Sequence, residues 1–229
     1  MAERKRPRRT RERILATSLD LFNRFGEPRI TTADIANEMN ISPGNLYYHF
    51  RNKDEIVVEL YAAFDAEVRP LLSAPEGRRI DVEDFWLLVH LLLERMQAYR
   101  FLYRDVADLA LRQRPLGSRF ARLLRDGEAT MRTIFAGMRD AGELDASDDA
   151  LAALARNAML NITQSMTYER LCHADRADAG DTNLNRVAHH VLMLIEPHLV
   201  GPARALISRI SRDYLAVGSP SRGNAGAVQ

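Results

Sequence analysis

Apolar residues recur along the chain at the three- and four-residue spacing of an amphipathic α-helix, and no alternating strand pattern of useful length interrupts them. The first helix is predicted over residues 10–25, and Gly26 follows it as a helix-ending glycine. Its inner face carries Ile14, Ser18, Leu21, Phe22 and Phe25. The repetition of this pattern predicts an all-α fold.

Capping residues divide the next stretch into two short helices. Thr31, with Asp34 three positions later, resembles a capping box at the start of a helix. Asn40 ends this helix, because asparagine tolerates the left-handed backbone better than most residues. Ser42 caps the following helix, with Pro43 at its first position, where the missing N–H costs nothing.

The remaining chain is also predicted to be helical. Asn52, with Glu55 three residues later, caps a fourth helix that runs to about Arg69. Beyond Gly77, turn signals separate helices over 81–99, 101–113, 115–140, 147–172, 183–199 and 202–215. The tail is rich in Gly, Ser and Ala and is predicted to be disordered. We expect a basic flexible arm at 1–9, a small domain at 10–53, a larger helical domain at 54–216 and the tail at 217–229.

The segment 31–49 has the outline of a helix-turn-helix, since its two short helices flank a tight turn at 40–42. On a helical wheel Leu46 and Phe50 face inward. The opposite face carries Tyr48, Gly44 and Asn45, flanked by Tyr47 and His49. Flat rings and hydrogen-bonding groups suit phosphate oxygens and base edges in a major groove. The alternative is that both tyrosines are half-buried packing residues.

Charge is distributed unevenly, although the 229-residue chain has a net charge of only +1. Residues 1–53 carry 11 Lys and Arg against six Asp and Glu, and the rest carries 21 against 25. A basic end on a slightly acidic body favours contact between the N-terminal quarter and a polyanion. Taken alone, the arginine-rich arm also fits a solvated tail, whereas beside a helix-turn-helix it favours an extra phosphate or minor-groove contact.

One stretch carries a family resemblance. The residues TTADIA at 31–36, followed by ISPGNLYYHFRNK at 41–53, resemble the DNA-binding domain of the tetracycline-repressor-like (TetR/AcrR) family. The resemblance covers about residues 10–60 and rests most specifically on Gly44, Leu46, Tyr47, His49, Phe50 and Lys53. It implies a homodimeric regulator with a helix-turn-helix domain and a C-terminal helical domain for ligand binding and dimerisation.

The resemblance also implies roles for single residues. Phosphates would be contacted by Thr31 or Thr32, Tyr47, His49 and Lys53, and Pro43, Gly44, Asn45 and Tyr48 would lie near the bases. Ser42 is also counted among the DNA-binding residues. Asn45 is best equipped to read a base, because an amide pairs bidentately with adenine. The chain departs from the family at Asn40, where glycine is frequent, and at Pro43, which has no donor and therefore reads at most by apolar contact.

Two further sites are expected in the C-terminal domain. The helices over 147–166 and 187–195 are apolar or small nearly all round, which predicts a four-helix dimer interface or, alternatively, a fully internal helix pair. The interface residues would be Leu151, Ala155, Ala158, Ile162, Val187, Val191 and Leu194. Large, soft residues in the middle helices fit ordinary core or, as the resemblance implies, an effector cavity. Its candidate residues are Trp86, His90, Phe101, Arg104, Met131, Phe135 and Asn161.

Other classes of function find little support. Glycine-rich phosphate loops and the Gly-x-Ser-x-Gly elbow are absent, so we expect no enzyme and no cofactor. The single cysteine, Cys172, and the pair His189-His190 do not have metal-ligand spacing, so no metal is expected. No apolar run reaches the length of a membrane span and no signal peptide is evident, which favours the cytoplasm.

The function predicted from the sequence is a sequence-specific transcriptional regulator that binds a pseudo-palindromic double-stranded operator as a homodimer. A small, largely apolar effector would release it, as a repressor. A ligand-responsive activator, a helical small-molecule binding protein without DNA function and a protein-interaction module are the alternatives.

Overall fold

The computed structural model describes residues 6–73, 77–172 and 184–217, and for 6–8 and 169–170 only the backbone. These residues form eleven α-helices and no strand, with one isolated bridge between Leu144 and Leu199, which confirms the all-α prediction. The helices are α1 Arg6–Phe25, α2 Thr32–Glu38, α3 Pro43–His49, α4 Lys53–Val68, α5 Val82–Ala98, α6 Arg100–Arg104, α7 Val106–Arg112, α8 Arg114–Asp140, α9 Asp148–Cys172, α10 Leu184–Ile195 and α11 Gly201–Val217. Three short 3-10 helices are η1 Glu27–Arg29, η2 Arg69–Leu72 and η3 Glu196–His198.

The predicted boundaries differ from the structure in three places. Helix α1 begins at Arg6, so residues 6–9 of the expected flexible arm are helical, and residues 1–5 lie outside the described part. The helix expected over 101–113 breaks at Asp105 into α6 and α7. Helix α10 ends at Ile195, because Pro197 follows within η3. The tail expected to be disordered lies outside the described residues except for Val217.

The caps read from the sequence are present. The Asp34 N–H donates to Thr31 Oγ1 over 3.2 Å, and the Thr31 N–H donates to Asp34 Oδ2 over 2.8 Å, which completes the capping box. Ser42 and Asn52 cap α3 and α4 through their side-chain oxygens. Asn40 adopts φ 52°, the left-handed conformation expected at the end of α2.

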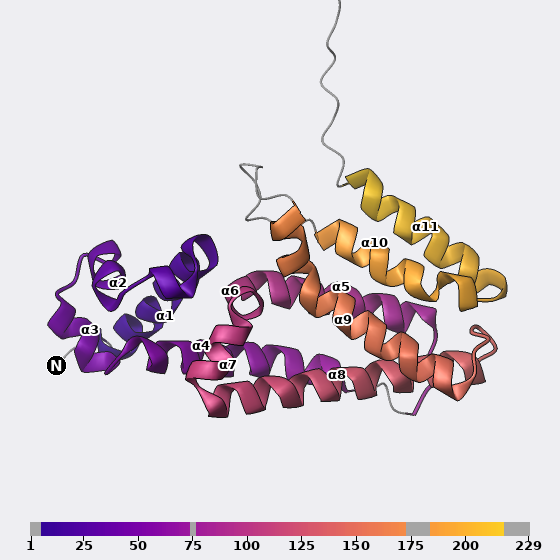
Figure 1. The fold of residues 1–229 in the computed structure, drawn as a ribbon, viewed down its shortest axis with the longest axis horizontal. Coiled ribbons are helices and arrows are strands. Elements are labelled where there is room, and N and C mark those ends of the chain that lie inside the picture. The colour runs from indigo at the N-terminus through magenta and orange to yellow at the C-terminus, as the bar shows by residue number, and fades with distance from the viewer. Residues whose placement is uncertain (1–5, 74–76, 173–183, 218–229) are drawn as a thin grey trace, which may run out of the picture.

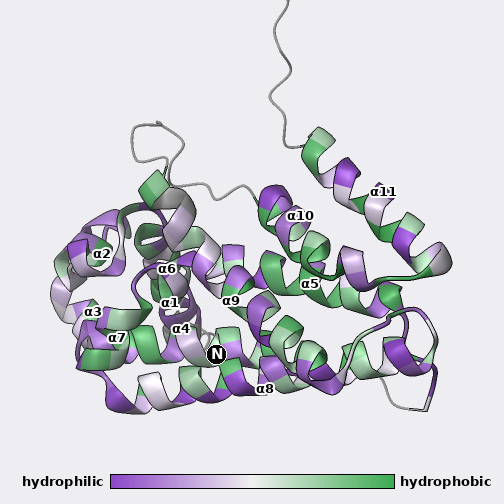
Figure 2. Ribbon diagram, turned by 45° about the vertical axis from the view of Figure 1, so that its right-hand side comes forward, coloured by the Kyte–Doolittle hydropathy of each residue, from purple (hydrophilic) through white to green (hydrophobic). Residues whose placement is uncertain are grey.

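The molecule consists of a small head and a larger body joined by α4 (Figure 1). The head contains α1, η1, α2 and α3, and the body contains α5 to α11. Helix α5 is hydrophobic along much of its length, whereas α8 and α11 alternate hydrophilic and hydrophobic residues, as surface helices do (Figure 2). Helix α5 accordingly packs against α4, α8 and α10 inside the body.

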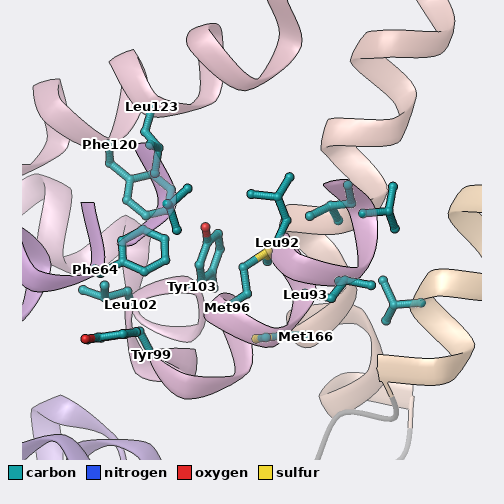
Figure 3. Packing of buried hydrophobic residues seen from close by; sticks show 14 of the residues in the cluster. Phe64, Leu92, Leu93, Met96, Tyr99, Leu102, Tyr103, Phe120, Leu123 and Met166 are labelled. Atoms are coloured by element: carbon teal, nitrogen blue, oxygen red, sulfur yellow. The ribbon is translucent and has the colours of Figure 1, made fainter. Parts of the chain in front are cut away.

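The core of the body forms where α4, α5, α6, α8 and α9 meet. Figure 3 shows Phe64 of α4, Tyr103 of α6 and Phe120 of α8 gathered on one side, and Leu92 and Met96 of α5 facing them. The Phe64 and Tyr103 rings lie 5.8 Å apart and the Tyr103 and Phe120 rings 5.3 Å apart, both edge to face. These contacts make α4 part of the body core as well as of the head.

Candidate nucleic-acid interface

Helix α3 presents the outward face predicted by the helical wheel. Leu46 and Phe50 are buried in the head, while Pro43, Gly44 and Asn45 are exposed. The side chains of Tyr47 and Tyr48 are 51% and 79% exposed, so neither is a half-buried packing residue. The polar face of α3 is therefore open to a ligand as large as DNA.

The flanks of this face are held by short-range contacts. Tyr47 Oη lies 3.0 Å from Thr32 Oγ1, which ties α3 to the start of α2. The His49 ring lies edge to face against Tyr48, with centroids 5.1 Å apart. The hydroxyls of Thr32 and Tyr47 thus lie side by side at the edge of the α3 face. The Thr31 hydroxyl instead donates to Asp34 over 2.7 Å, and this hydrogen bond and that of the Thr31 N–H lower the pKa of Asp34.

Lys53 is occupied by the protein itself, which the resemblance did not indicate. Its ammonium donates to the carbonyl oxygens of Glu27 and Ile30, each at 2.9 Å, and lies 3.0 Å from Glu27 Oε1. The Glu27 carboxylate is completely buried. In this structure Lys53 therefore holds η1 against the start of α4 and reaches a phosphate only by giving up these contacts.

Sequence reasoning missed Glu27, which forms the centre of a charged cluster. Its second carboxylate oxygen accepts a hydrogen bond from Arg112 of α7 at 2.7 Å, and its N–H donates to Asp105 at 3.1 Å. Arg112 comes 85 residues later in the chain. No local spacing rule links residues so far apart, so only the folded structure brings them together.

The predicted dimer residues require a correction. Leu151, Ala155, Ala158, Ile162, Val187 and Val191 are at most 2% exposed within the single chain, because α9 packs against α6, α8 and α10. Leu194 is only partly exposed. Within the single chain, the six buried residues therefore pack as the fully internal helix pair that was the alternative prediction. The small side chains of Ala155 and Ala158 let one chain cover α9 on several sides.

A different face of the same helices is open. Leu160, Tyr168 and Leu171 of α9 are 50%, 66% and 72% exposed, and Met193 of α10 is 39% exposed. Residues 157, 160, 164, 168 and 171 recur at helical spacing on one side of α9. A groove of about 430 Å³ runs between the two helices, lined by Leu160, Asn161, Gln164, Ser165, Tyr168, Val187 and His190.

The seven predicted effector residues do not meet in one cavity. Phe101, Met131 and Phe135 are fully buried, and Phe101 and Phe135 pack against the rings of Phe22 and Phe85 at 5.3 and 5.1 Å. Arg104 hydrogen-bonds to the backbone at the end of α1. Trp86 and His90 both bond to the Tyr214 hydroxyl, at 3.0 and 2.9 Å. Asn161 faces outward on α9.

A small cavity of about 10 Å³ lies elsewhere in the body, lined by Tyr61, Leu102, Val106, Leu109, Ala110, Leu116, Gly117 and Phe120. The buried Tyr61 hydroxyl finds no hydrogen-bond partner among the described residues. Burial raises the pKa of Tyr61 to about 12 and also raises the pKa of Tyr103. A polar group without a partner in an apolar core calls for an explanation.

Over the described ranges, no cluster of three metal-ligating side chains is found, and no helix has the length and apolar character of a membrane span. Cys172 is exposed at the end of α9, and His173 lies outside the described residues.

Both parts of the chain match families of known proteins. Residues 14–60 match the family described as "Bacterial regulatory proteins, tetR family", and residues 63–207 match the family described as "Bacterial transcriptional repressor". A probable acrEF/envCD operon repressor of Escherichia coli is 32% identical over 53 residues, which are 23% of this chain. The match spans 24% of the length of that relative.

Solved structures extend the similarity over most of the chain. A TetR-family transcriptional regulator from Marinobacter aquaeolei is 34% identical, with a TM-score of 0.81, over 90% of this chain and 98% of that one. A putative transcriptional regulator from Saccharomonospora viridis in complex with choline is 23% identical over 85% and 99% of the two chains, with a TM-score of 0.59. A SmeT–triclosan complex is 20% identical over 85% and 94%, with a TM-score of 0.58. SmeT is described as the repressor of a multidrug efflux pump of Stenotrophomonas maltophilia. The Saccharomonospora viridis regulator and SmeT thus share the fold of this chain.

Proposed function

The chain belongs to the TetR family of bacterial transcriptional regulators, and we propose that it is a homodimeric repressor that a small molecule releases from a pseudo-palindromic operator. The observation that carries DNA binding is the outward face of α3. Buried Leu46 and Phe50 anchor this helix, while Asn45 and the exposed Tyr47 and Tyr48 project from the head. Exposed aromatic and amide groups in this position suit phosphates and base edges.

Dimerisation is proposed through the open face of α9 and α10. The exposed Leu160, Tyr168 and Leu171 form an apolar stripe of the kind that a second copy covers, and Met193 extends it onto α10. A two-fold axis through this face would place one head on each half of an inverted repeat. This assignment replaces the buried residues predicted from the sequence.

An effector site is proposed around Tyr61 in the body. The unpartnered Tyr61 hydroxyl lies among apolar residues. Such a site suits a compact, largely apolar compound with one group that hydrogen-bonds to this hydroxyl. The cavity of about 10 Å³ is far too small for such a compound. The effector would therefore stabilise a more open body and shift the population away from the packed arrangement, which we assign to DNA binding.

The experiment for DNA binding is selection of full-length protein on random double-stranded DNA, followed by sequencing. We expect enrichment of an inverted repeat, with affinity that falls steeply as salt rises. Absence of any enriched motif would contradict the proposal and favour the helical binding protein or the interaction module.

The experiment for effector release uses the recovered operator and two probes, triclosan and choline, because relatives of the same fold bind them. Apolar triclosan is expected to weaken operator binding, and cationic choline is expected to leave it unchanged. Placing the operator upstream of a reporter then separates repressor from activator, since a repressor lowers expression.

A further inference from the structure

The body contacts the head at the turn after α1. There α6 and α7 pack against the end of α1 and against η1, and we call this contact region the junction. The Arg104 guanidinium donates to the carbonyl oxygen of Phe22 and, at 3.4 Å, to that of Asn23. The Asn23 amide donates to the carbonyl oxygen of Ala98 at 2.8 Å and accepts from the Phe101 N–H at 3.1 Å. This half of the junction fixes the end of α1.

The other half of the junction is the buried Glu27 carboxylate. One oxygen faces Lys53 at 3.0 Å, and the other accepts from Arg112 at 2.7 Å. Lys53 begins α4, whereas Arg112 ends α7, so the carboxylate is shared between the connecting helix and the body. A fully buried carboxylate is stable only with cations and donors around it. Glu27 therefore couples the position of η1 to the position of α7.

Among the partners of Glu27, Arg112 is the one that can exchange this contact for others. Its side chain is 37% exposed and also lies 2.9 Å from Asp108 and 3.6 Å from Asp54. The hydrogen bond that Arg112 donates to Glu27 is the main cause that raises the pKa of Arg112. With three carboxylates in reach and partial contact with water, Arg112 can leave Glu27 without losing all its partners.

We propose that Arg112 is a positioning residue that determines operator specificity. Through Glu27 it fixes the angle between head and body, and thereby the half-site spacing that the dimer accepts. The inference rests on the proposed function, because spacing has meaning only for a dimer with two DNA-binding heads. It concerns the geometry of the operator and leaves base reading to α3.

The physical reason is that the Arg104–Asn23 half of the junction holds the end of α1, whereas Arg112 supplies the side-chain contact from α7 to η1. Helix α4 is the only covalent link between head and body, and its first turn belongs to the head. Without the contact between Arg112 and Glu27, the head keeps its own fold and its α3 face but is held less firmly against α7. A wider range of half-site spacings should then bind at similar affinity.

The experiment is selection on a pool of double-stranded DNA that varies the spacer between two half-sites, with the full-length chain and Arg112→Ala. The matched control is Arg139→Ala, because Arg139 also joins two helices, pairing with Asp148 at 2.6 Å, and is exposed to 35%. Arg139 lies at the end of α8, outside the junction.

We expect wild type and Arg139→Ala to enrich one dominant spacing. Arg112→Ala is expected to enrich the same half-site sequence, while its preference for the best spacing over the next falls by about tenfold, a typical effect of losing one charge-assisted hydrogen bond. Arg112→Lys, which keeps the charge, should restore part of this preference. Thermal unfolding followed by circular dichroism shows that each variant is folded.

A spacing distribution for Arg112→Ala identical to that of wild type would overturn the inference while leaving the proposed function intact. Failure of wild type to enrich any paired half-sites would overturn both. If Arg112→Ala changed the half-site sequence as well as the spacing, its role would be structural and the inference would be wrong.

Discussion

Asn45 uses its backbone in the structure and leaves its side chain exposed. Its backbone N–H donates to Ser42 Oγ at 3.2 Å and thereby completes the cap of α3, while its side chain is exposed. Pro43 and Gly44 beside it have no side-chain donor, so Asn45 supplies the amide of this first turn. The backbone of Asn45 thus serves the fold, while its side chain stays available to a ligand.

Replacing Asn45 tests base reading. Asn45→Ala should cost about 1–3 kcal/mol of binding free energy at the best operator and relax the preference at one base pair of each half-site, since a bidentate amide contact is lost. Binding profiles of wild type and variant over a library of operator variants measure this. Thr133→Ala, at an exposed position of α8, is the control. An unchanged profile for Asn45→Ala would exclude this residue from base reading.

Replacing Lys53 separates a structural role from a phosphate contact. Lys53→Ala should lower the free energy of unfolding by about 1.5–3 kcal/mol, because the carbonyl oxygen of Glu27 loses a charged donor and its buried carboxylate loses a neighbouring cation. The slope of log K against log salt should not change. A slope flattened by about 0.9 would instead mean that Lys53 leaves Glu27 for a phosphate in the complex. Arg51→Ala, a neighbouring cation whose side chain is 89% exposed, is the control for folding stability.

Replacing Tyr61 tests the unpartnered hydroxyl. Because the pKa of Tyr61 in the folded chain is about 12, above the ordinary 10.0, the folded state keeps its proton longer than the unfolded state. Stability is therefore lost as pH rises from about 10 to about 12. Tyr61→Phe should remove this contribution and raise stability at neutral pH by about 1 kcal/mol, since a buried polar group is deleted. Denaturant unfolding at pH 7 and pH 11 measures both effects, with Tyr48→Phe at the surface as control.

At the scale of elements, α9 shows why an apolar pattern does not reveal its partner. Its small residues let α8 and α10 approach closely, so one chain covers most of its circumference. The stripe left open contains Leu160 and Tyr168, together with the polar Gln164. A mixed stripe of this kind is less conspicuous in a sequence than the alanines and leucines that turn inward.

Charge substitutions distinguish the two sides of α9. Leu160→Arg should give a folded monomer, because it places charges together on the proposed dimer face. Ala155→Arg should lower stability by about 3 kcal/mol or more, because it forces a long charged side chain into the core. Sedimentation and circular dichroism measure assembly and folding. A Leu160→Arg chain that stays dimeric would exclude this face as the interface.

Local signals allowed much of the fold to be predicted. The caps at Thr31, Ser42 and Asn52 depend on residues three positions away, and all three are present. The outward face of α3 follows from helical periodicity, and the exposures of Tyr47 and Tyr48 agree with it. The cluster around Glu27 and the burial of Val191 depend on segments that are distant in sequence, so periodicity alone could not predict them.

At the scale of the whole molecule, α11 packs along α10 at the edge of the body and also contacts α5 (Figure 1). The Trp86 indole N–H can only donate, so the Tyr214 hydroxyl accepts from it and is free to donate to His90 Nδ1. This chain of hydrogen bonds fastens α11 to α5. Trp86, the only tryptophan in the sequence, thus reports on the docking of α11.

Tyr214→Phe should shift the fluorescence of Trp86, because the indole loses its acceptor, and should lower stability by about 1 kcal/mol. Operator affinity and half-site spacing should stay as in wild type, since neither the junction nor α3 is involved. Emission spectra and the DNA selection measure these outcomes. A changed spacing preference would mean that α11 also influences the angle of the head.

The order of the partners of Glu27 along the chain matters while the protein is being synthesised. Lys53 follows Glu27 by 26 residues, whereas Arg112 follows it by 85. The head leaves the ribosome first, at a stage when α7 has not been made. Lys53 can neutralise the Glu27 carboxylate during that interval, so the nascent head can close around a paired charge. Arg112 is synthesised later and then joins the head to α7.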